Sequence, residues 1–434
     1  PRDYWTQVID IELPPIVRFE RQGGGKEAID KAAKLLSEAK FPVILSGAGV
    51  VIGDAIEDCK KLAEKLDAPV CNGYQHNDSF PGSHPLAVGP LGYNGSKAGM
   101  ELISKADVVL ALGTRLNPFS TLPGYGIDYW PKNAKIIQVD MNPDRIGLTK
   151  KVTVGICGDA KMVSQQILEK LTPTAGDNGR DERKNLIHKT KSAWLQTLTG
   201  LDHEEDDPGT VWNKEARERD ADRMSPRQAW RAIQAGMPED VIISSDIGNN
   251  CAIGNAYPTF EKPRKYLAPG LFGPCGYGFP SILGAKIGCP DTPVIGFAGD
   301  GAFGISMNEM SSCAREEWPA ITMVIFRNYQ WGAEKRNSIL WFDDNFVGTE
   351  LDPELSYAKV ANACGLKGVT VKTMEETTKA IKQSCEDQKK GITTFIEVIL
   401  NQELGEPFRR DAMKKPVRVA GIKKEDMRPQ KGLN

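Results

Sequence analysis

The sequence lacks the features that mark several large classes of protein. Its 434 residues carry a formal net charge of −2, so no excess of basic residues favours nucleic acid or an anionic membrane as a partner. No apolar run reaches the length that spans a bilayer, and no secretory signal is visible. We therefore expect neither a membrane nor a nucleic acid among its partners.

The sequence also lacks paired cysteines and clustered histidines. The nine cysteines are scattered, their number is odd, and none form a Cys-x-x-Cys pair. The four histidines (His76, His84, His188 and His203) show no metal-ligand spacing. This pattern favours a reduced, cytoplasmic setting over a disulfide framework or a zinc site.

The chain begins at Pro1 without an initiator methionine, so we expect a fragment, a processed form, or part of something longer. Its length predicts two or three domains. The fold class expected is α/β, with two doubly wound domains, each built on a parallel sheet. The segments expected are an interdomain linker (1–25), a middle α/β domain (26–171), a charged connector (172–224), a second α/β domain (225–400) and a C-terminal tail (401–434).

The middle domain shows regular alternation of helical and strand patterns. Helices are expected over 28–39 and 56–66, and strands over 43–46, 68–71, 108–112 and 135–139. Its Gly47–Gly53 loop invites a dinucleotide-binding interpretation, but Ile52 stands where the third glycine is required. No ribose-binding acid follows the next strand, so a structural turn is favoured over an NAD site.

The charged connector includes one predicted helix near 184–198, and the rest is interpreted as exposed. Ser225 and Pro226 then have the positions of an N-cap and a first helical turn. The strands expected in the second domain are 241–245, 294–298, 321–326 and 394–399.

One stretch of the second domain carries the clearest chemistry. A predicted strand ends in Gly299-Asp300-Gly301, and the next predicted strand is followed by Asn328. Neighbouring parallel strands would place Asp300 and Asn328 side by side, at the sheet edge where open α/β sheets bind ligands. With the backbone carbonyl of Gln330, these oxygens suit Mg²⁺ bound to a diphosphate. The alternative is a tight turn, and the position of Asn328 favours the metal site.

These residues resemble the motif of a known enzyme family, which ends in two asparagines. In this chain Arg327 occupies the first of these two positions and the ligand Asn328 keeps the second. The spacing is one residue longer than in many relatives. The stretches RNYQWGAEKRN, WFDDNFVGTEL and GEPFRRDAMKKPV resemble the sulfoacetaldehyde acetyltransferase branch, and the likeness covers essentially the whole chain. The residues similar to the diphosphate-binding motif of thiamine-diphosphate (ThDP) enzymes are Gly299-Asp300-Gly301, Glu309, Pro319 and Asn328.

The resemblance implies an acyltransferase that uses ThDP and Mg²⁺. It would convert sulfoacetaldehyde and phosphate to acetyl phosphate and sulfite, in the degradation of sulfonates such as taurine. It also implies a homodimer or homotetramer. In the family, the glutamate that activates the cofactor lies in a pyrimidine-binding domain that ends at a segment like Pro1-Arg2-Asp3, so we expect this chain to lack that domain. Some relatives hold FAD in the middle domain, where we expect a vestigial or absent flavin site.

The resemblance also assigns residues to cofactor binding. In relatives a bulky apolar residue lies beneath the thiazolium, where this chain has the smaller Cys275, with Phe272 as a possible assistant. A nucleophilic role for Cys275 is the less favoured alternative. The metal ligands expected are Asp300, Asn328 and Gln330. The cofactor-binding residues expected are Gly248, Asn249, Asn250, Gly273, Cys275, Gly299, Asp300, Gly301, Ala302 and Asn328.

Two basic residues directly after the metal loop are candidates for binding the sulfonate and the phosphate. Lys335 and Arg336 have the required charge, and arginine donates hydrogen bonds in pairs to oxyanions. For either residue, a solvated charge on a helix face is an equal alternative. Arg409 and Arg410 in the tail are weaker candidates.

Two other functions stay open on the sequence alone. One is another ThDP carboligase or decarboxylase, of the acetolactate synthase type, acting on pyruvate. The other is a non-catalytic chain that retains the fold. Neither the proton-transfer residues nor the ability of this form to bind cofactor follows from the sequence.

Overall fold

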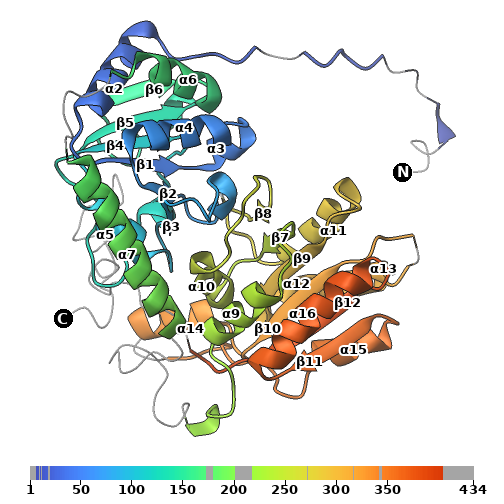
Figure 1. Cartoon of the computed structure of the whole chain (residues 1–434). Helices are drawn as coiled ribbons and strands as arrows, with labels where there is room; N and C mark the ends of the chain where they lie inside the picture. Colours follow the sequence, from blue (N-terminus) through green and yellow to red (C-terminus); the bar gives the residue numbers. More distant parts are fainter. Residues whose placement is uncertain are drawn as a thin grey trace, which may run out of the picture.

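Two separate parallel β-sheets, each covered by helices, organise the computed structural model of the chain (Figure 1). This confirms the predicted fold class. Part of the predicted linker, part of the charged connector and most of the tail, with Arg409 and Arg410, lie outside the described residues. The structure describes residues 6–8, 10, 12–17, 20–172, 179–200, 218–270, 272–315, 317–341 and 345–403.

The first sheet forms the middle domain and has the order β3-β2-β1-β4-β5-β6, with every pairing parallel. Its central strands are fully buried, as expected for parallel strands covered on both faces. The strands are β1 (Pro42–Ser46), β2 (Val70–Asn72), β3 (Ala87–Pro90), β4 (Val108–Leu112), β5 (Lys135–Asp140) and β6 (Val154–Cys157).

Helices of the middle domain bury one apolar face each. In α4, Cys59, Leu62 and Leu66 lie at helical spacing and face the core, and the helix ends at Asp67 in the left-handed conformation. The Gly47–Gly53 run forms a short helix, and its Gly49 packs against the backbone of Gly113, which supports a structural role. The helices are α2 (Lys26–Glu38), α3 (Ala48–Ile52), α4 (Ile56–Leu66), α5 (Lys97–Ile103) and α6 (Ala160–Lys170).

The second sheet has the order β11-β12-β10-β9-β7-β8 and is also parallel throughout. The chain leaves β7 toward β8 and returns on the other side to β9, so a topological switch point lies between β7 and β9. The strands are β7 (Ile242–Ser245), β8 (Tyr266–Leu267), β9 (Val294–Gly299), β10 (Thr322–Arg327), β11 (Lys367–Val371) and β12 (Thr394–Ile399).

Alternate residues of these strands feed two cores, one on each face of the second sheet. Trp230 of α9 packs against Phe297 and Phe326 on one face, and Phe279 of α11 packs against Phe303 and Phe395 on the other. The helices are α9 (Pro226–Gly236), α10 (Asn249–Ile253), α11 (Gly278–Gly288), α12 (Asp300–Ser306), α13 (Met310–Cys313), α14 (Gly332–Trp341), α15 (Tyr357–Ala363) and α16 (Met374–Gln388).

The start of α9 has the predicted cap. The Ser225 side chain accepts a hydrogen bond from the Gln228 backbone, and the Gln228 side chain accepts one from Ser225 in return. Pro226 occupies the first turn, where its missing N–H has no consequence. This capping box fixes the beginning of the second domain's first helix.

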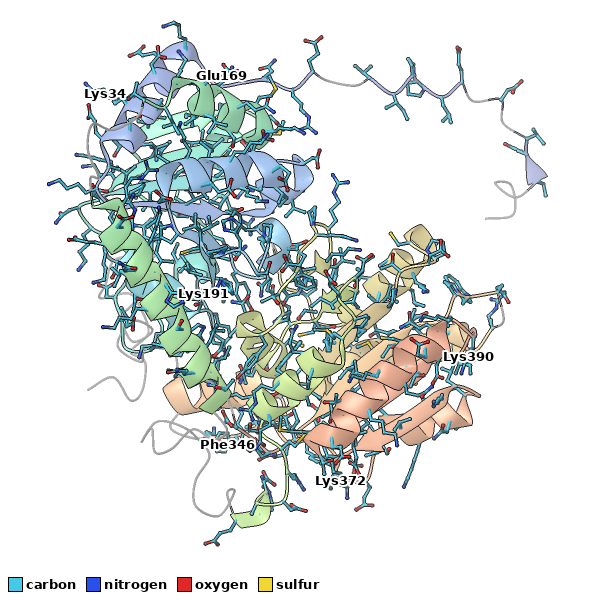
Figure 2. All side chains as sticks on the ribbon, in the orientation of Figure 1. Lys34, Glu169, Lys191, Phe346, Lys372 and Lys390 are labelled. Atoms are coloured by element: carbon cyan, nitrogen blue, oxygen red, sulfur yellow. The ribbon has the colours of Figure 1, made fainter. Side chains whose placement is uncertain are left out.

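A long helix and several buried polar contacts join the two domains. Figure 1 shows α7 (Arg180–Gly200) running from the middle domain toward the second domain. Lys191 of α7, labelled in Figure 2, donates to the His84 carbonyl at 2.9 Å. Asn77 Nδ2 donates to the carbonyls of Asn255 (2.9 Å) and Pro258 (2.8 Å), which ties the middle domain to the segment that follows α10.

Candidate cofactor and metal site

Loops that follow β7, β9 and β10 line one cavity at the carboxyl edge of the second sheet. The β7–β9 switch point lies within this edge, which is the ordinary position of a ligand in an open α/β sheet. All the residues expected to bind cofactor or metal line it, except Gly273. The lining residues are Ile247, Gly248, Asn249, Asn250, Cys275, Gly299, Asp300, Gly301, Ala302, Asn328, Gln330, Trp331, Gly332, Ala333 and Glu334.

Three donors fix the carboxylate of Asp300, which is only 1% exposed. Its Oδ1 accepts from the Gly301 N–H at 3.0 Å, and its Oδ2 accepts from the Tyr329 N–H at 2.7 Å and from Arg327 Nη1 at 3.0 Å. Burial raises the pKa of Asp300 to about 6, against the opposing effects of Arg327 and the two backbone donors. The position of the carboxylate is therefore set by the protein itself.

Arg327, at the position where the family motif has an asparagine, is completely buried. Its Nη2 donates to the Leu355 carbonyl at 2.9 Å and to the Asp352 carbonyl, and its Nε lies 3.8 Å from Glu397 Oε1. The guanidinium thus balances the charges of two buried carboxylates, Asp300 and Glu397. Burying either carboxylate alone would cost several kcal/mol.

The turn after β10 is built around a left-handed tyrosine. Tyr329 has φ +61°, a conformation that costs a non-glycine residue about 1–2 kcal/mol. Two guanidinium groups lie over its ring, with the Arg327 Cζ 4.2 Å and the Arg223 Cζ 4.9 Å from the ring centroid. This turn brings Asn328 and Gln330, the residues on either side of Tyr329, to the same cavity.

The oxygen atoms of this edge fit a divalent cation. Asn328 is 2% exposed, and its Oδ1 has no hydrogen-bond partner within the described residues. Gln402 fixes the loop by donating to the Asn328 carbonyl at 3.2 Å and by accepting from Gln330 Nε2 at 3.1 Å. Across the described ranges, no group of three or more His, Cys, Asp or Glu residues could hold a metal. A carboxylate with amide and carbonyl oxygens suits Mg²⁺, which takes its remaining ligands from phosphates and water.

Asp246, at the end of β7, organises the glycine-rich loop on the other side of the cavity. Its carboxylate accepts from the N–H groups of Gly276 (3.1 Å) and Gly278 (2.8 Å), and burial raises its pKa. The loop places Cys275 in the cavity wall, whereas Gly273, at φ +69°, lies outside the lining. Burial also raises the pKa of the Cys275 thiol, which disfavours the thiolate that a nucleophile requires.

The first residues of α10 form the third wall. Gly248 has φ +132°, a conformation essentially reserved for glycine, and Asn249 and Asn250 follow it, both buried. Asn249 Oδ1 accepts from the Tyr93 hydroxyl at 2.9 Å. Tyr93 belongs to the middle domain, and no sequence pattern predicts this contact because 156 residues separate Tyr93 from Asn249.

Both predicted anion-binding residues are buried, so a solvated helix face is the wrong alternative for Lys335 (9% exposed) and Arg336 (6%). Lys335 pairs with Glu350 and lies 5.5 Å from the ring of Phe346, labelled in Figure 2. Arg336 Nη1 donates to the Tyr93 hydroxyl at 2.5 Å. Their role toward an anionic substrate stays a prediction.

These features define an α/β protein with a cavity at its sheet edge, whose oxygen donors fit a divalent cation. Comparison with known families names the class. Residues 29–171 match the family described as "Thiamine pyrophosphate enzyme, central domain", and residues 246–398 match "Thiamine pyrophosphate enzyme, C-terminal TPP binding domain". The chain belongs to the thiamine pyrophosphate enzyme family, whose typical cofactor is ThDP with Mg²⁺.

The chain is similar to curated proteins along its whole length. It is 78% identical, over 433 residues, to the "Probable sulfoacetaldehyde acetyltransferase" of Rhizobium meliloti (strain 1021), covering 100% of this chain and 73% of that protein. It is 74% identical to the "Sulfoacetaldehyde acetyltransferase" of Roseovarius nubinhibens, covering 99% of this chain and 71% of the relative. The predicted family and branch are therefore confirmed.

A solved structure shares the fold. The benzoylformate decarboxylase from Polynucleobacter necessarius superposes with a TM-score of 0.69 at 20% sequence identity, covering 94% of this chain and 70% of that one. At this identity the likeness shows the fold alone. Within the described residues, no helix is both long and apolar enough to cross a membrane.

Proposed function

We propose that the chain converts sulfoacetaldehyde and inorganic phosphate to acetyl phosphate and sulfite, using ThDP and Mg²⁺. The reaction balances without an external oxidant. The carbon–sulfur bond breaks and a carbon–oxygen bond to phosphate forms, while the aldehyde carbon is oxidised to an acyl carbon and its neighbour is reduced to a methyl group. Sulfite leaves with the electron pair of the carbon–sulfur bond and takes up the proton of hydrogen phosphate. The aldehyde carbon loses its hydrogen as a proton, and the new methyl group gains one proton in its place.

The observation that carries this proposal is the single cavity shared by Asp300, Asn328 and Asn249, in a chain that aligns from end to end with relatives of that name. A chain that merely retained the fold would have no requirement for a buried oxygen-donor set. The names of the relatives supply the substrate, which the cavity alone does not specify.

Asp300, Asn328 and the backbone carbonyl of Gln330 would hold the metal ion, and the N–H groups at the start of α12 would face the diphosphate. When bound, ThDP supplies the carbanion chemistry and electron sink that carbon–sulfur cleavage requires. The chain's own contribution is to fix these groups in place. Asp300 is held by three donors before any ligand arrives, and Asp246 holds the loop that carries Cys275.

We further propose a cytoplasmic homodimer or homotetramer with small-molecule substrates. All nine cysteines are free thiols, which supports a reducing compartment. Measuring the mass of the full-length protein in solution, by light scattering, tests the oligomeric state. A monomer at assay concentration would contradict this part of the proposal.

Replacing Asp300 tests the proposed metal site. We expect Asp300→Ala to abolish Mg²⁺-dependent ThDP binding, measured by calorimetry on the full-length protein, because the carboxylate is the only charged ligand proposed. Asp352→Ala is a suitable control, since the Asp352 backbone carbonyl, and not its carboxylate, contacts Arg327. Undiminished ThDP binding by Asp300→Ala would refute the assignment.

A substrate comparison tests the reaction itself. The full-length protein should release sulfite from sulfoacetaldehyde only when phosphate, ThDP and Mg²⁺ are all present, and acetyl phosphate should form in equal amount. Consumption of pyruvate with release of carbon dioxide would instead support an acetolactate synthase type of enzyme. Tight ThDP binding with turnover of neither substrate would indicate a non-catalytic chain.

A further inference from the structure

A hydrogen-bonded chain crosses the boundary between the two domains and ends in the cofactor cavity. Arg336 on α14 donates to the hydroxyl of Tyr93 at 2.5 Å, and this hydroxyl lies 2.9 Å from Asn249 Oδ1. Arg336 and Asn249 are each 6% exposed, so solvent has little access to either end. Tyr93 comes from the middle domain, between β3 and α5, whereas the other two residues belong to the second domain.

The chemistry of arginine fixes the direction of this chain. A guanidinium has only donors, so the Tyr93 oxygen accepts from Arg336 and its own proton must go onward. The acceptor for that proton is the oxygen of the Asn249 amide, which therefore faces Tyr93. The amide nitrogen is then directed away from Tyr93, and one buried arginine determines which end of Asn249 is available as a donor.

The amide nitrogen of Asn249, which is directed away from Tyr93, is an unpaired donor. This Nδ2 is buried and has no hydrogen-bond partner within the described residues. Leaving a buried donor unpaired costs about 1–3 kcal/mol, so such a group points to a ligand. Asn249 lines the same cavity as Asp300 and Gly301, at the edge where the cofactor diphosphate is proposed above to bind.

We propose that Arg336 and Tyr93 are positioning residues, which orient the Asn249 amide so that its Nδ2 donates to the cofactor diphosphate. The middle domain would thereby contribute to cofactor affinity without touching the cofactor. The inference depends on the cofactor of the family and not on the substrate proposed above. It also gives different roles to the two basic residues predicted to bind anions. Lys335 pairs with Glu350, whereas Arg336 donates to Tyr93.

ThDP binding to the metal-loaded, cofactor-free, full-length protein tests the proposal. Tyr93→Phe removes only the hydroxyl, and we expect it to raise the Kd for ThDP roughly 5- to 10-fold, as for the loss of one oriented hydrogen bond. Arg336→Met should act in the same direction, and Arg336→Lys should recover part of the affinity because lysine can still donate. Calorimetry with inorganic diphosphate should show a similar loss for Tyr93→Phe, whereas the binding of free thiamine should not change.

Matched controls come from the same domain boundary. Tyr74→Phe makes the same change in a ring whose centroid lies 6.5 Å from that of Tyr93. Arg115→Met removes an arginine whose Nη2 donates to the Gly270 carbonyl at 2.8 Å across the boundary. Neither control should change the Kd for ThDP by more than about twofold, since a twofold change lies below the contribution of one hydrogen bond.

Three results would overturn the proposal. One is an unchanged Kd for ThDP in both Tyr93→Phe and Arg336→Met. Another is an equal loss of affinity for free thiamine and for inorganic diphosphate, which would indicate general loosening of the domain boundary. The third is unchanged ThDP binding with a raised KM for sulfoacetaldehyde or phosphate, which would assign the amide to a substrate anion. The first two results are measured by binding alone, so they do not depend on whether sulfite is released.

Discussion

At the scale of single residues, Arg327 shows how one substitution in a motif changes the electrostatics of a site. Its guanidinium contacts Asp300 and approaches Glu397, both buried, and it also stacks on Tyr329. A neutral asparagine at this position would leave the two carboxylates without that positive charge. The metal-free site therefore depends on Arg327 for charge balance.

Replacing Arg327 should reveal this charge balance. We expect Arg327→Met to lower the free energy of unfolding of the metal-free protein by about 3–5 kcal/mol, as when one partner of a buried ion pair is removed. The loss should be smaller with Mg²⁺ and ThDP, because the cation supplies a positive charge next to Asp300. Chemical denaturation with and without the ligands measures both values.

Arg223 provides the control for this experiment. It stacks on the same tyrosine ring but pairs with Asp220, at 2.9 Å. Arg223→Met should cost about 1 kcal/mol or less and should not respond to Mg²⁺, because Arg223 is partly exposed and the buried Asp220 keeps its pairing with Arg219. If Arg327→Met loses the same stability with and without Mg²⁺ and ThDP, the cation does not replace the positive charge that Arg327 places next to Asp300.

At the scale of elements, the start of α12 depends on a close approach between two segments. A Cβ built on Gly301 would lie 2.8–2.9 Å from three ring carbons of Trp331, closer than real Cβ contacts. Trp331 immediately precedes α14, and its indole ring cannot bend, so the added methyl group would have to displace either α12 or the loop after β10. Both segments line the cofactor cavity.

We expect Gly301→Ala to weaken ThDP binding at least tenfold, because a displacement of this kind disturbs the N–H groups at the start of α12 and the proposed metal ligands together. Calorimetric titration with ThDP and Mg²⁺ measures the change. Gly304→Ala is the matched control within α12, since its Cβ would meet only the Tyr357 hydroxyl, at 3.2 Å. Equal ThDP affinity in the two variants would contradict the steric explanation.

The elements also show what the sequence could predict. The strands expected from apolar runs were found, including those before Asp300 and Asn328, because central parallel strands are buried on both faces. The four strands that sequence patterns missed, β3, β6, β8 and β11, are the edge strands of the two sheets. These edge strands are only partly buried, and β8 has only two residues, so they lack a continuous apolar signal.

Within the site, the sequence was sufficient to predict which residues meet on neighbouring strands, but not which residues meet across the domain boundary. Asp300 and Asn328 follow strands that pair directly, so their meeting at one edge could be inferred from order along the chain. The contact of Arg336 with Tyr93 joins residues 243 positions apart, across a domain boundary. No periodicity or spacing encodes such a contact, because it depends on how two separately folded units pack.

At the scale of the whole molecule, a histidine at the domain boundary connects stability to pH. His76 lies between β2 and the segment that contacts the second domain, and its pKa is lowered from 6.5 to about 4, first by burial and then by the positive charge of Arg115. Between these two values the unfolded chain binds a proton that the folded chain does not. Stability must therefore fall as the pH falls from 6.5 toward 4.

The expected contribution of His76 is about 3 kcal/mol over this interval, at 1.36 kcal/mol per pKa unit. Urea denaturation of the protein and of His76→Gln, at a series of pH values, isolates this effect from that of the acidic residues. The difference in unfolding free energy between the two proteins should change with pH between 6.5 and 4, and should be constant above pH 7. A constant difference throughout would show that His76 titrates normally.

The way Asp300 is held has a practical consequence. Its three donors belong to the polypeptide, so treatment with a chelator leaves the carboxylate in the same orientation. Reloading would then require no rebuilding of the loop, and its speed would be set by how quickly the hydrated ion sheds water. Stripped preparations should consequently regain full occupancy soon after magnesium is restored, without a refolding step.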